Sequence, residues 1–117
     1  MLEERVAQFA ARAISVCEVL PERIGSAHLR DQLFRSATSV AANYAEASVP
    51  ESRKDFAHKI GVALKELVES RMWLRIISAK RYVEPRALQK LLAETDELIC
   101  IFNASVKTAR KRIANEK

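Results

Sequence analysis

The sequence predicts an all-α protein, specifically an antiparallel up-down-up-down four-helix bundle, and three observations support this prediction. Only 2 Gly and 3 Pro occur in 117 residues, whereas sandwiches and barrels need turn residues every few positions. Hydrophobic residues make up 49% of the chain, which is enough for a sizeable core. Apolar residues recur at steps of three and four along four segments, as they do on one face of a helix. Residues 1–117 are therefore expected to form a single bundle domain.

The first two helices are expected at residues 3–20 and 26–47. The apolar stripe of the first helix consists of Val6, Phe9, Ala13, Val16 and Leu20. Pro21 ends this helix, and Gly25 is expected to supply a flexible break before the next. The stripe of the second helix consists of Leu29, Leu33, Ser36, Val40 and Asn43.

The third and fourth helices are expected at residues 52–80 and 85–114. Ser52 followed by Asp55 resembles a capping box, and Pro85 occupies the favoured first turn of the last helix. The predicted stripe of the third helix is Phe56, Ile60, Ala63, Leu67, Ser70, Leu74 and Ile77. The predicted stripe of the fourth helix is Leu88, Leu91, Thr95, Leu98, Phe102, Ser105, Ala109 and Ile113. Short connections make consecutive helices antiparallel neighbours, although a dimer of helical hairpins with a four-helical core is the main alternative.

The third helix carries more apolar surface than its own chain needs. Beside its main stripe runs a second row, which consists of Ala57, Gly61, Leu64, Val68 and Met72. This row widens the apolar face beyond that of one surface helix. We therefore expect neighbouring copies of the chain to cover it.

Basic residues are concentrated in two regions, although the formal net charge of the chain is only +5. Residues 107–117 hold five Lys or Arg against Glu116, a net charge of +4, and residues 50–83 hold eight against four acids. Such patches attract nucleic acid or an acidic partner protein, but they are also typical of a solvated helix end. The candidate contact residues are Arg53, Lys54, Lys59, Arg71, Arg75, Lys107, Arg110, Lys111 and Arg112. Because aromatic residues make up only 6%, any nucleic-acid contact would be electrostatic rather than a base-stacking platform.

Candidates for catalysis and for metal binding are few. His28 and His58 fall near the starts of different helices at positions expected to be exposed, and no Gly-x-Ser-x-Gly elbow occurs. Glu66 and Glu69 form a Glu-x-x-Glu pair, but they flank the core position between them, so contact with solvent or a neighbouring subunit is preferred over a metal site. We expect no enzyme activity and no cofactor.

The two cysteines and the hydropathy indicate the compartment. Cys17 and Cys100 are isolated within helical apolar patterns and are expected to be buried free thiols, which suits a reducing environment. The chain opens with no recognisable leader, and no uncharged apolar run approaches the ~18 residues that span a bilayer. A cytoplasmic protein without membrane contact is the expectation.

A polar ridge on the second helix precedes the most specific motif of the chain. Ser39, Asn43 and Glu46 share one side of that helix, and we expect them to hold the following loop by binding backbone groups at the start of the third helix. A ligand site is the alternative. The run from Gln32 to Ala47, then Ser52 to Phe56, then Lys59 to Glu66, resembles the 23S rRNA-intervening-sequence protein family in order and spacing.

This resemblance implies a small bacterial four-helix bundle whose copies form a ring, typically a homopentamer. Some members of the family are encoded within ribosomal RNA intervening sequences, which suggests an association with RNA. The family brings no catalytic residues. Five positions match its motif and are expected to be structural: Asn43, Glu46, Ser52, Asp55 and Phe56.

Three functions remain open from the sequence. The first is a non-catalytic homo-oligomeric scaffold or adaptor whose basic surfaces contact RNA or an acidic protein. The second is a structural or protein-recruiting oligomer without a role in nucleic-acid binding. The third is a bundle enzyme that binds a small molecule or a metal.

Overall fold

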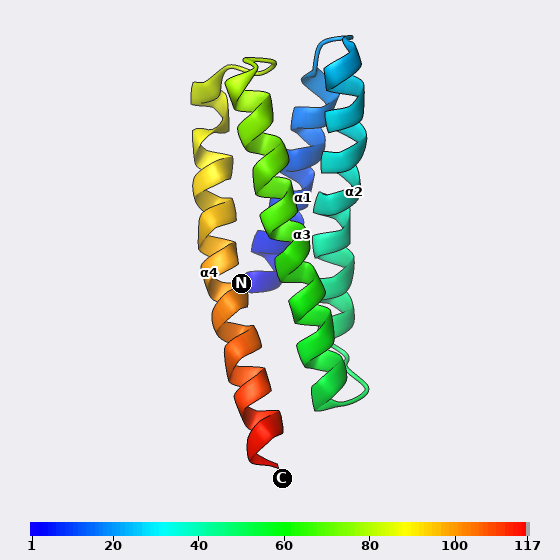
Figure 1. Cartoon of the computed structure of the whole chain (residues 1–117), viewed down its shortest axis with the longest axis vertical. Helices are drawn as coiled ribbons and strands as arrows, with labels where there is room; N and C mark the ends of the chain where they lie inside the picture. Colours follow the sequence, from blue (N-terminus) through cyan, green and yellow to red (C-terminus); the bar gives the residue numbers. More distant parts are fainter. Residues whose placement is uncertain (117) are drawn as a thin grey trace.

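The computed structural model describes residues 1–116 and consists of four helices joined by short connections (Figure 1). They are α1 (Leu2–Val19), α2 (Ile24–Ala47), α3 (Arg53–Ala79) and α4 (Pro85–Asn115). Their ends differ from the predicted ends by at most two residues. Lys117, which belongs to the predicted basic end, lies outside the described residues.

The helices pack in sequential order as an all-α bundle, and consecutive helices run in opposite directions (Figure 1). α2 packs on α1 and α3, α3 packs on α4, and α1 makes its less extensive contact with α4. The bundle measures 53 by 22 by 21 Å.

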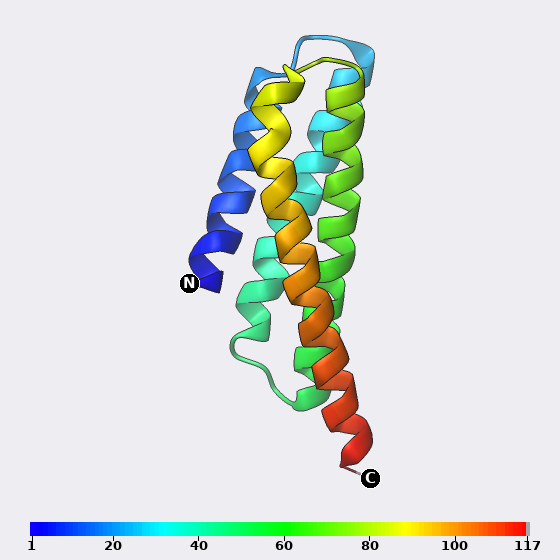
Figure 2. The same ribbon diagram turned by 90° about the vertical axis from the view of Figure 1, so that its left-hand side faces the viewer.

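The four helices differ in length, and this difference divides the bundle into two regions. α1 has 18 residues and α4 has 31. The N-terminus of α1 therefore lies far above the C-terminal end of α4 in Figure 2. The connection between α2 and α3 lies between these two levels, below the N-terminus of α1. We call residues 44–61 and 101–116, which lie largely beyond α1, the open end of the bundle. The other described residues form the closed part.

The predicted apolar stripes form the core of the closed part. Every predicted stripe residue of α1 is buried, and so are all of those in α3 from Ile60 to Ile77. The largest fully buried side chains of this core include Phe9, Leu33, Leu74 and Leu98. A second, smaller cluster of buried residues lies in the open end and consists of Ala47, Ile60 and Val106.

Four predicted stripe positions are wrong, and all lie toward the open end. Ala57, rather than Phe56, is buried in the first turns of α3, and Phe56 is partly exposed. In α4, Val106 takes the buried position predicted for Ser105. The predicted stripe residues Asn43 and Ile113 are also only partly buried. Since α1 does not reach this level, side chains there have less protein to cover them.

Local sequence signals set the ends of α3. The Ser52 hydroxyl accepts a hydrogen bond from the Asp55 amide at 3.0 Å, which confirms half of the predicted capping box. The Asp55 carboxylate accepts from the Glu51 amide at 3.1 Å instead of from the amide of Ser52. At the other end, Arg81 adopts a left-handed conformation with φ of 56°, and the amides of Arg81 and Tyr82 donate to carbonyls of the last helical turn.

Gly25 does not act as the predicted flexible break, because it is the second residue of α2. Its role is spatial: a Cβ atom at this position would lie 2.7 Å from the Tyr82 hydroxyl. Gly25 therefore lets the connection between α3 and α4 pack on the start of α2.

The cysteine prediction is half right. Cys17 is a buried free thiol whose pKa is raised by burial, whereas Cys100 is exposed. Within residues 1–116, no helix combines the length and the apolar character that crossing a bilayer requires.

Candidate functional site

The predicted basic contact residues fall into two groups, depending on whether an acid of the same chain neutralises them. Arg71 on α3 pairs with Asp96 on α4 at 3.0 Å. Arg53 pairs with Glu116, and Lys59 pairs with Glu46, whose hydrogen bond raises the pKa of the lysine. The remaining six have no ion-pair partner among residues 1–116, and they are Lys54, Arg75, Lys107, Arg110, Lys111 and Arg112.

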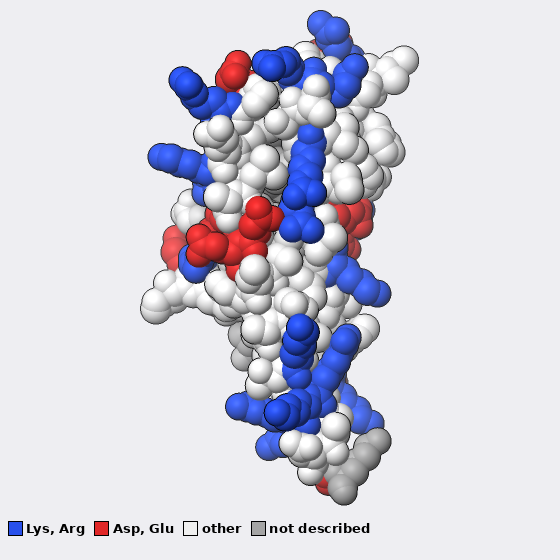
Figure 3. All heavy atoms as spheres, turned by 60° about the vertical axis from the view of Figure 1, so that its left-hand side comes forward, with Lys and Arg blue, Asp and Glu red and all other residues white. Residues whose placement is uncertain are grey.

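Five of these six unpaired cations belong to the open end, and all five are exposed. Figure 3 shows Lys and Arg side chains at both ends of the molecule, including a group around the narrow end where α4 terminates, and most of the acidic side chains of this face at mid-height. We call Lys54, Lys107, Arg110, Lys111 and Arg112 the basic cluster. Its charges are free to attract an anionic partner from solution.

The two arginines near the end of α4 lie on different sides of that helix, because residues two apart in an α-helix are about 200° apart around its axis. The Arg110 guanidinium lies beside α3, where its Nη2 atom is 4.0 Å from the point that a Cβ of Gly61 would occupy. Arg112 instead lines a groove on the other side. The open end thus presents cations to two separate surfaces.

The groove has a volume of about 1040 Å³ and lies between the start of α3 and the second half of α4. Its uncharged walls include Pro50, Phe56, Ile101, Ala104, Ser105 and Thr108. Its charged lining residues are Arg53 and Arg112, which are both cations. This hollow was not predicted, because it depends on which side of α4 faces the space beyond α1.

The second apolar row of α3 is exposed toward its outer end. Val68 and Met72 are 42% and 52% exposed, and Gly61 and Leu64 are partly buried. A Cβ atom at Gly61 would have the Arg110 guanidinium, 4.0 Å away, as its nearest neighbour. The packing of residues 1–116 therefore leaves room for a side chain at this position. A glycine inside a helix costs about 1 kcal/mol relative to alanine, and no contact among residues 1–116 accounts for that cost.

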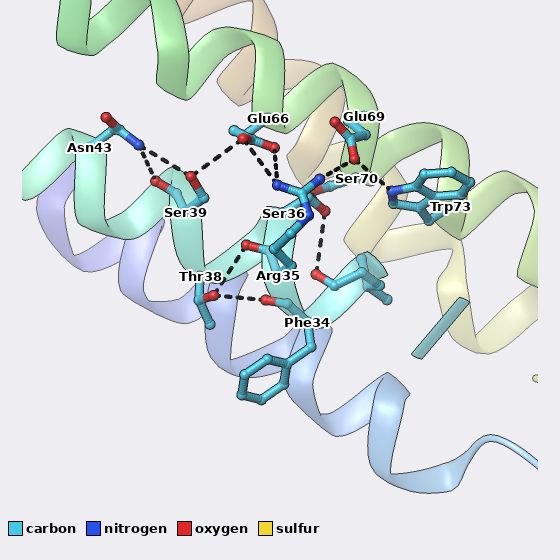
Figure 4. A network of polar contacts seen from close by, with 11 residues as sticks. Phe34, Arg35, Ser36, Thr38, Ser39, Asn43, Glu66, Glu69, Ser70 and Trp73 are labelled. Atoms are coloured by element: carbon cyan, nitrogen blue, oxygen red, sulfur yellow. Dashed lines mark hydrogen bonds and ion pairs between the residues drawn. The ribbon is translucent and has the colours of Figure 1, made fainter. Parts of the chain in front are cut away.

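The polar ridge of α2 makes contacts that differ from the predicted ones. Asn43 donates to the Ser39 carbonyl at 2.9 Å and to its hydroxyl at 3.2 Å, so it binds within its own helix (Figure 4). Glu46 binds the Lys59 side chain rather than backbone groups at the start of α3. The predicted tie between this ridge and the loop is therefore wrong, and the Ser52 cap holds the start of α3.

Glu66 and Glu69, predicted to face solvent or a neighbouring subunit, bind within the chain. Arg35 on α2 donates to both Glu66 oxygens at 3.3 Å and also binds Glu69 (Figure 4). Glu69 also accepts from the Trp73 indole at 3.3 Å. Sequence reasoning missed Arg35, although it precedes Ser39 by one helical turn and so extends the polar ridge.

The remaining candidates for catalysis or metal binding lie apart from one another. His28 and His58 are exposed, as predicted, and lie on different helices. His28 makes an edge contact with the Trp73 ring, with centroids 6.1 Å apart. Among residues 1–116, no three His, Cys, Asp or Glu side chains gather where they could hold one metal ion.

Comparison with known proteins gives one family and a solved relative. The family model described as 23S rRNA-intervening sequence protein matches residues 3–104. A crystal structure from Bacteroides thetaiotaomicron, described as a protein with unknown function from the S23 ribosomal protein family, is 26% identical and superposes with a TM-score of 0.82. This similarity covers 92% of the present chain and 99% of the other. No match is found among the curated proteins.

Proposed function

The chain belongs to the 23S rRNA-intervening sequence protein family, and from this premise we propose that it is a non-catalytic homo-oligomeric scaffold that binds RNA through the basic cluster of its open end. The observation that carries the proposal is the set of five exposed cations, none of which pairs with an acid in residues 1–116. Four of the five lie within residues 107–112, so their charges act together at the end of α4.

Binding in this proposal is electrostatic and largely independent of base sequence. Lys and Arg side chains displace counterions from the phosphate backbone, so the affinity falls steeply as salt is added. Recognition by base stacking is not part of the proposal, because Phe56 is the only aromatic side chain in the groove and the basic cluster itself contains none.

Self-assembly is the second part of the proposal, and its support is the second apolar row of α3. Val68 and Met72 expose apolar surface, and Gly61 leaves room for another helix to approach. Contact between copies along this row accounts for both features. A homopentameric ring, which the family resemblance implies, would place several basic clusters side by side, and multivalent attachment would raise the affinity of the assembly above that of one chain.

A salt titration tests the RNA-binding part. The variant Lys107→Gln, Arg110→Gln, Lys111→Gln removes three charges outside the groove, and a matched control removes three charges at the opposite end through Arg23→Gln, Arg86→Gln, Lys90→Gln. Anisotropy of a labelled single-stranded RNA of arbitrary sequence would be followed from ~50 mM salt upward. We expect the first variant to lose about tenfold or more in affinity and its log–log salt slope to fall by about 2. Equal behaviour of both variants would contradict the proposal.

The mass of the protein in solution tests the self-assembly part. Val68→Glu places a charge in the second row of α3, whereas Val19→Glu places the same charge at an exposed position of α1. Sedimentation or light scattering is expected to show an oligomer for the unmodified protein and for Val19→Glu, and smaller species for Val68→Glu. An unmodified protein that is monomeric and well folded at micromolar concentration would refute the scaffold.

The groove favours a second function, that of a protein-recruiting oligomer with no role in nucleic-acid binding. Grooves lined by apolar and small side chains are typical of protein-binding surfaces. A stable oligomer that ignores RNA even at ~50 mM salt, where attraction to phosphate is strong, would favour this function over the first.

A further inference from the structure

The groove of the open end occupies the place where a longer α1 would pack. α1 is thirteen residues shorter than α4 (18 against 31), which corresponds to about 20 Å of helix. We propose that the groove receives one amphipathic helix of a partner protein, with an apolar face and acidic flanks. This proposal goes beyond RNA binding and does not depend on it.

The position of the groove follows from the contacts that hold the start of α1. Arg5 binds Glu94 at 2.6 Å and Glu97 at 3.1 Å, so these two residues mark the side of α4 that faces α1. Ile101 follows Glu94 by seven residues, or about two turns, and therefore lies on the same side. Because Ile101 lines the groove, the groove continues the path of α1 along α4. Figure 2 shows that α4 and the α2–α3 connection extend below the level of the N-terminus of α1.

The walls of the groove suit the close approach of a helix. Ala104, Ser105 and Thr108 are small and lie along one side of α4 at steps of one and three residues. The distance between packed helices depends on the side chains at their contact, so small residues allow a partner helix to come near. Phe56 and Ile101 are partly buried and leave apolar surface that an amphipathic helix would cover. The pattern is that of helix-in-groove recognition.

The charges of the groove specify acidic flanks on the partner. Both charged lining residues, Arg53 and Arg112, are cations. Glu116 of the same chain already binds Arg53, which demonstrates that a carboxylate fits at this position. A partner carboxylate would compete with Glu116 for Arg53 and would find Arg112 without a partner among residues 1–116. The groove is therefore complementary to an acidic helix and repels a basic one.

A synthetic helix tests the proposal directly on the intact protein. The probe is a fluorescent peptide of about 14 residues, long enough to span ~20 Å as a helix, with Leu and Ala on one face and Glu on both flanks. Its counterpart carries Lys in place of every Glu. We expect the acidic peptide to bind and the basic peptide to bind at least tenfold more weakly. Equal binding of the two peptides, or no binding of the acidic one, would overturn the proposal.

Two pairs of variants locate the bound peptide. Ala104→Trp fills the groove, and its control Ala93→Trp makes the same change at an exposed site on α4 outside it. Arg112→Gln removes a groove charge, and its control Arg110→Gln removes a charge on the other side of the helix. We expect at least a tenfold loss of affinity for the first member of each pair and less than a twofold change for the second. Peptide affinity that Ala104→Trp leaves unchanged would refute the groove as the site.

Unlike the groove variants above, Glu116→Gln is expected to raise the affinity for the acidic peptide. Because Glu116 occupies Arg53, its neutralisation frees the arginine, and the acidic peptide is expected to bind severalfold more tightly. A loss of affinity in Glu116→Gln would contradict the competition between the two carboxylates.

RNA and a second copy of the chain are the two other molecules that could occupy the groove. Ala104→Trp distinguishes them from a partner helix when RNA binding and the mass of the assembly are measured as well. If Ala104→Trp abolishes RNA binding while the peptide fails to bind, the groove belongs to nucleic acid and the proposal is wrong. If Ala104→Trp lowers the mass of the assembly while the peptide fails to bind, a second copy fills the groove and the proposal is also wrong. The RNA variant Lys107→Gln, Arg110→Gln, Lys111→Gln leaves the groove lining intact, so failure of RNA binding and failure of peptide binding are separate results.

Discussion

The closed part and the open end of this bundle share three of the same helices, yet they differ in what covers them. In the closed part, α1 completes the bundle and side chains such as Phe9, Leu33 and Leu74 are fully buried. In the open end, which α1 does not reach, Phe102 is the one large side chain of the described residues that is fully buried, and the other buried residues are Ala47, Ala57, Ile60, Val106 and Ala109. The apolar core is thus concentrated in the closed part, whereas the open end carries the close run of cations at the end of α4, Lys107, Arg110, Lys111 and Arg112.

This division is what a binding protein with a small core requires. Burial of apolar area at about 25 cal/mol per Å² makes the closed part the main source of stability. The open end adds little burial and carries charges that repel one another until an anionic partner arrives. Binding surfaces are generally drawn from the less stable regions of a protein. We expect the open end to be the first part of the chain to lose structure.

The largest test of this difference uses the same substitution at both ends of α3. Ile77 lies in the closed part and is fully buried, whereas Ile60 lies in the open end and is 3% exposed. Ile77→Ala is expected to cost about 3–4 kcal/mol because four packed helices cannot collapse around the cavity, and Ile60→Ala about 2 kcal/mol because three can relax. Urea unfolding measures both values. If Ile60→Ala lowers the free energy of unfolding as much as Ile77→Ala does, the two regions are equally well packed.

The sequence predicted the closed part well because helical periodicity reports burial wherever a helix is covered along one side. The steps of three and four from Ile60 to Ile77 are all buried as predicted. In α4, a strict heptad pattern leads to Ser105, but a helix of 3.6 residues per turn drifts by about 20° per heptad, and Val106 takes the buried position. The prediction that Phe56 is buried is wrong for another reason: its spacing fits the helical stripe, but α1 does not extend far enough to cover this ring.

The candidate site was predicted in its composition and not in its arrangement. The sequence identifies the basic residues of the C-terminal end, but Arg53, Lys59 and Arg71 bind acids from distant positions. Long side chains can reach several partners, so their pairing depends on how the helices are placed side by side. The lengths of α1 and α4 were predicted closely, yet the groove follows only from knowing which face of α4 packs against α1.

A second test compares the two glycines of the chain. A Cβ at Gly25 in the closed part would lie 2.7 Å from the Tyr82 hydroxyl, so Gly25→Ala is expected to cost about 1 kcal/mol through overpacking. Gly61 in the open end has space, so Gly61→Ala is expected to stabilise the isolated protomer by about 0.5–1 kcal/mol through better helix propensity.

Two further measurements make the glycine comparison specific. Tyr82→Phe removes the hydroxyl that meets the new methyl group, so it should recover most of the loss in Gly25→Ala. Gly61→Ala should weaken self-association while it stabilises the protomer, and sedimentation combined with thermal unfolding would detect both effects. If Gly61→Ala destabilises the protomer, the glycine serves the packing of its own chain and loses its role as support for an interface.

The smallest expected effect lies at the boundary between the two regions, where Arg5 attaches the start of α1 to α4. The hydrogen bond from Arg5 lowers the pKa of Glu94 below its ordinary value of 4.5. As the pH falls, the unfolded chain therefore binds a proton at Glu94 before the folded chain does. The contribution of the ion pair to stability is present above pH 4.5 and is lost as the pH falls through the pKa of Glu94 in the folded state.

Because the ion pair is partly exposed, Glu94→Gln should cost less than about 1 kcal/mol at pH 7, and its difference in stability from the unmodified protein should shrink toward pH 3. Glu18→Gln, at an exposed position without an ion pair in residues 1–116, is the control, and a difference for Glu94→Gln that stays constant with pH would show that Arg5 does not hold α1 through this carboxylate.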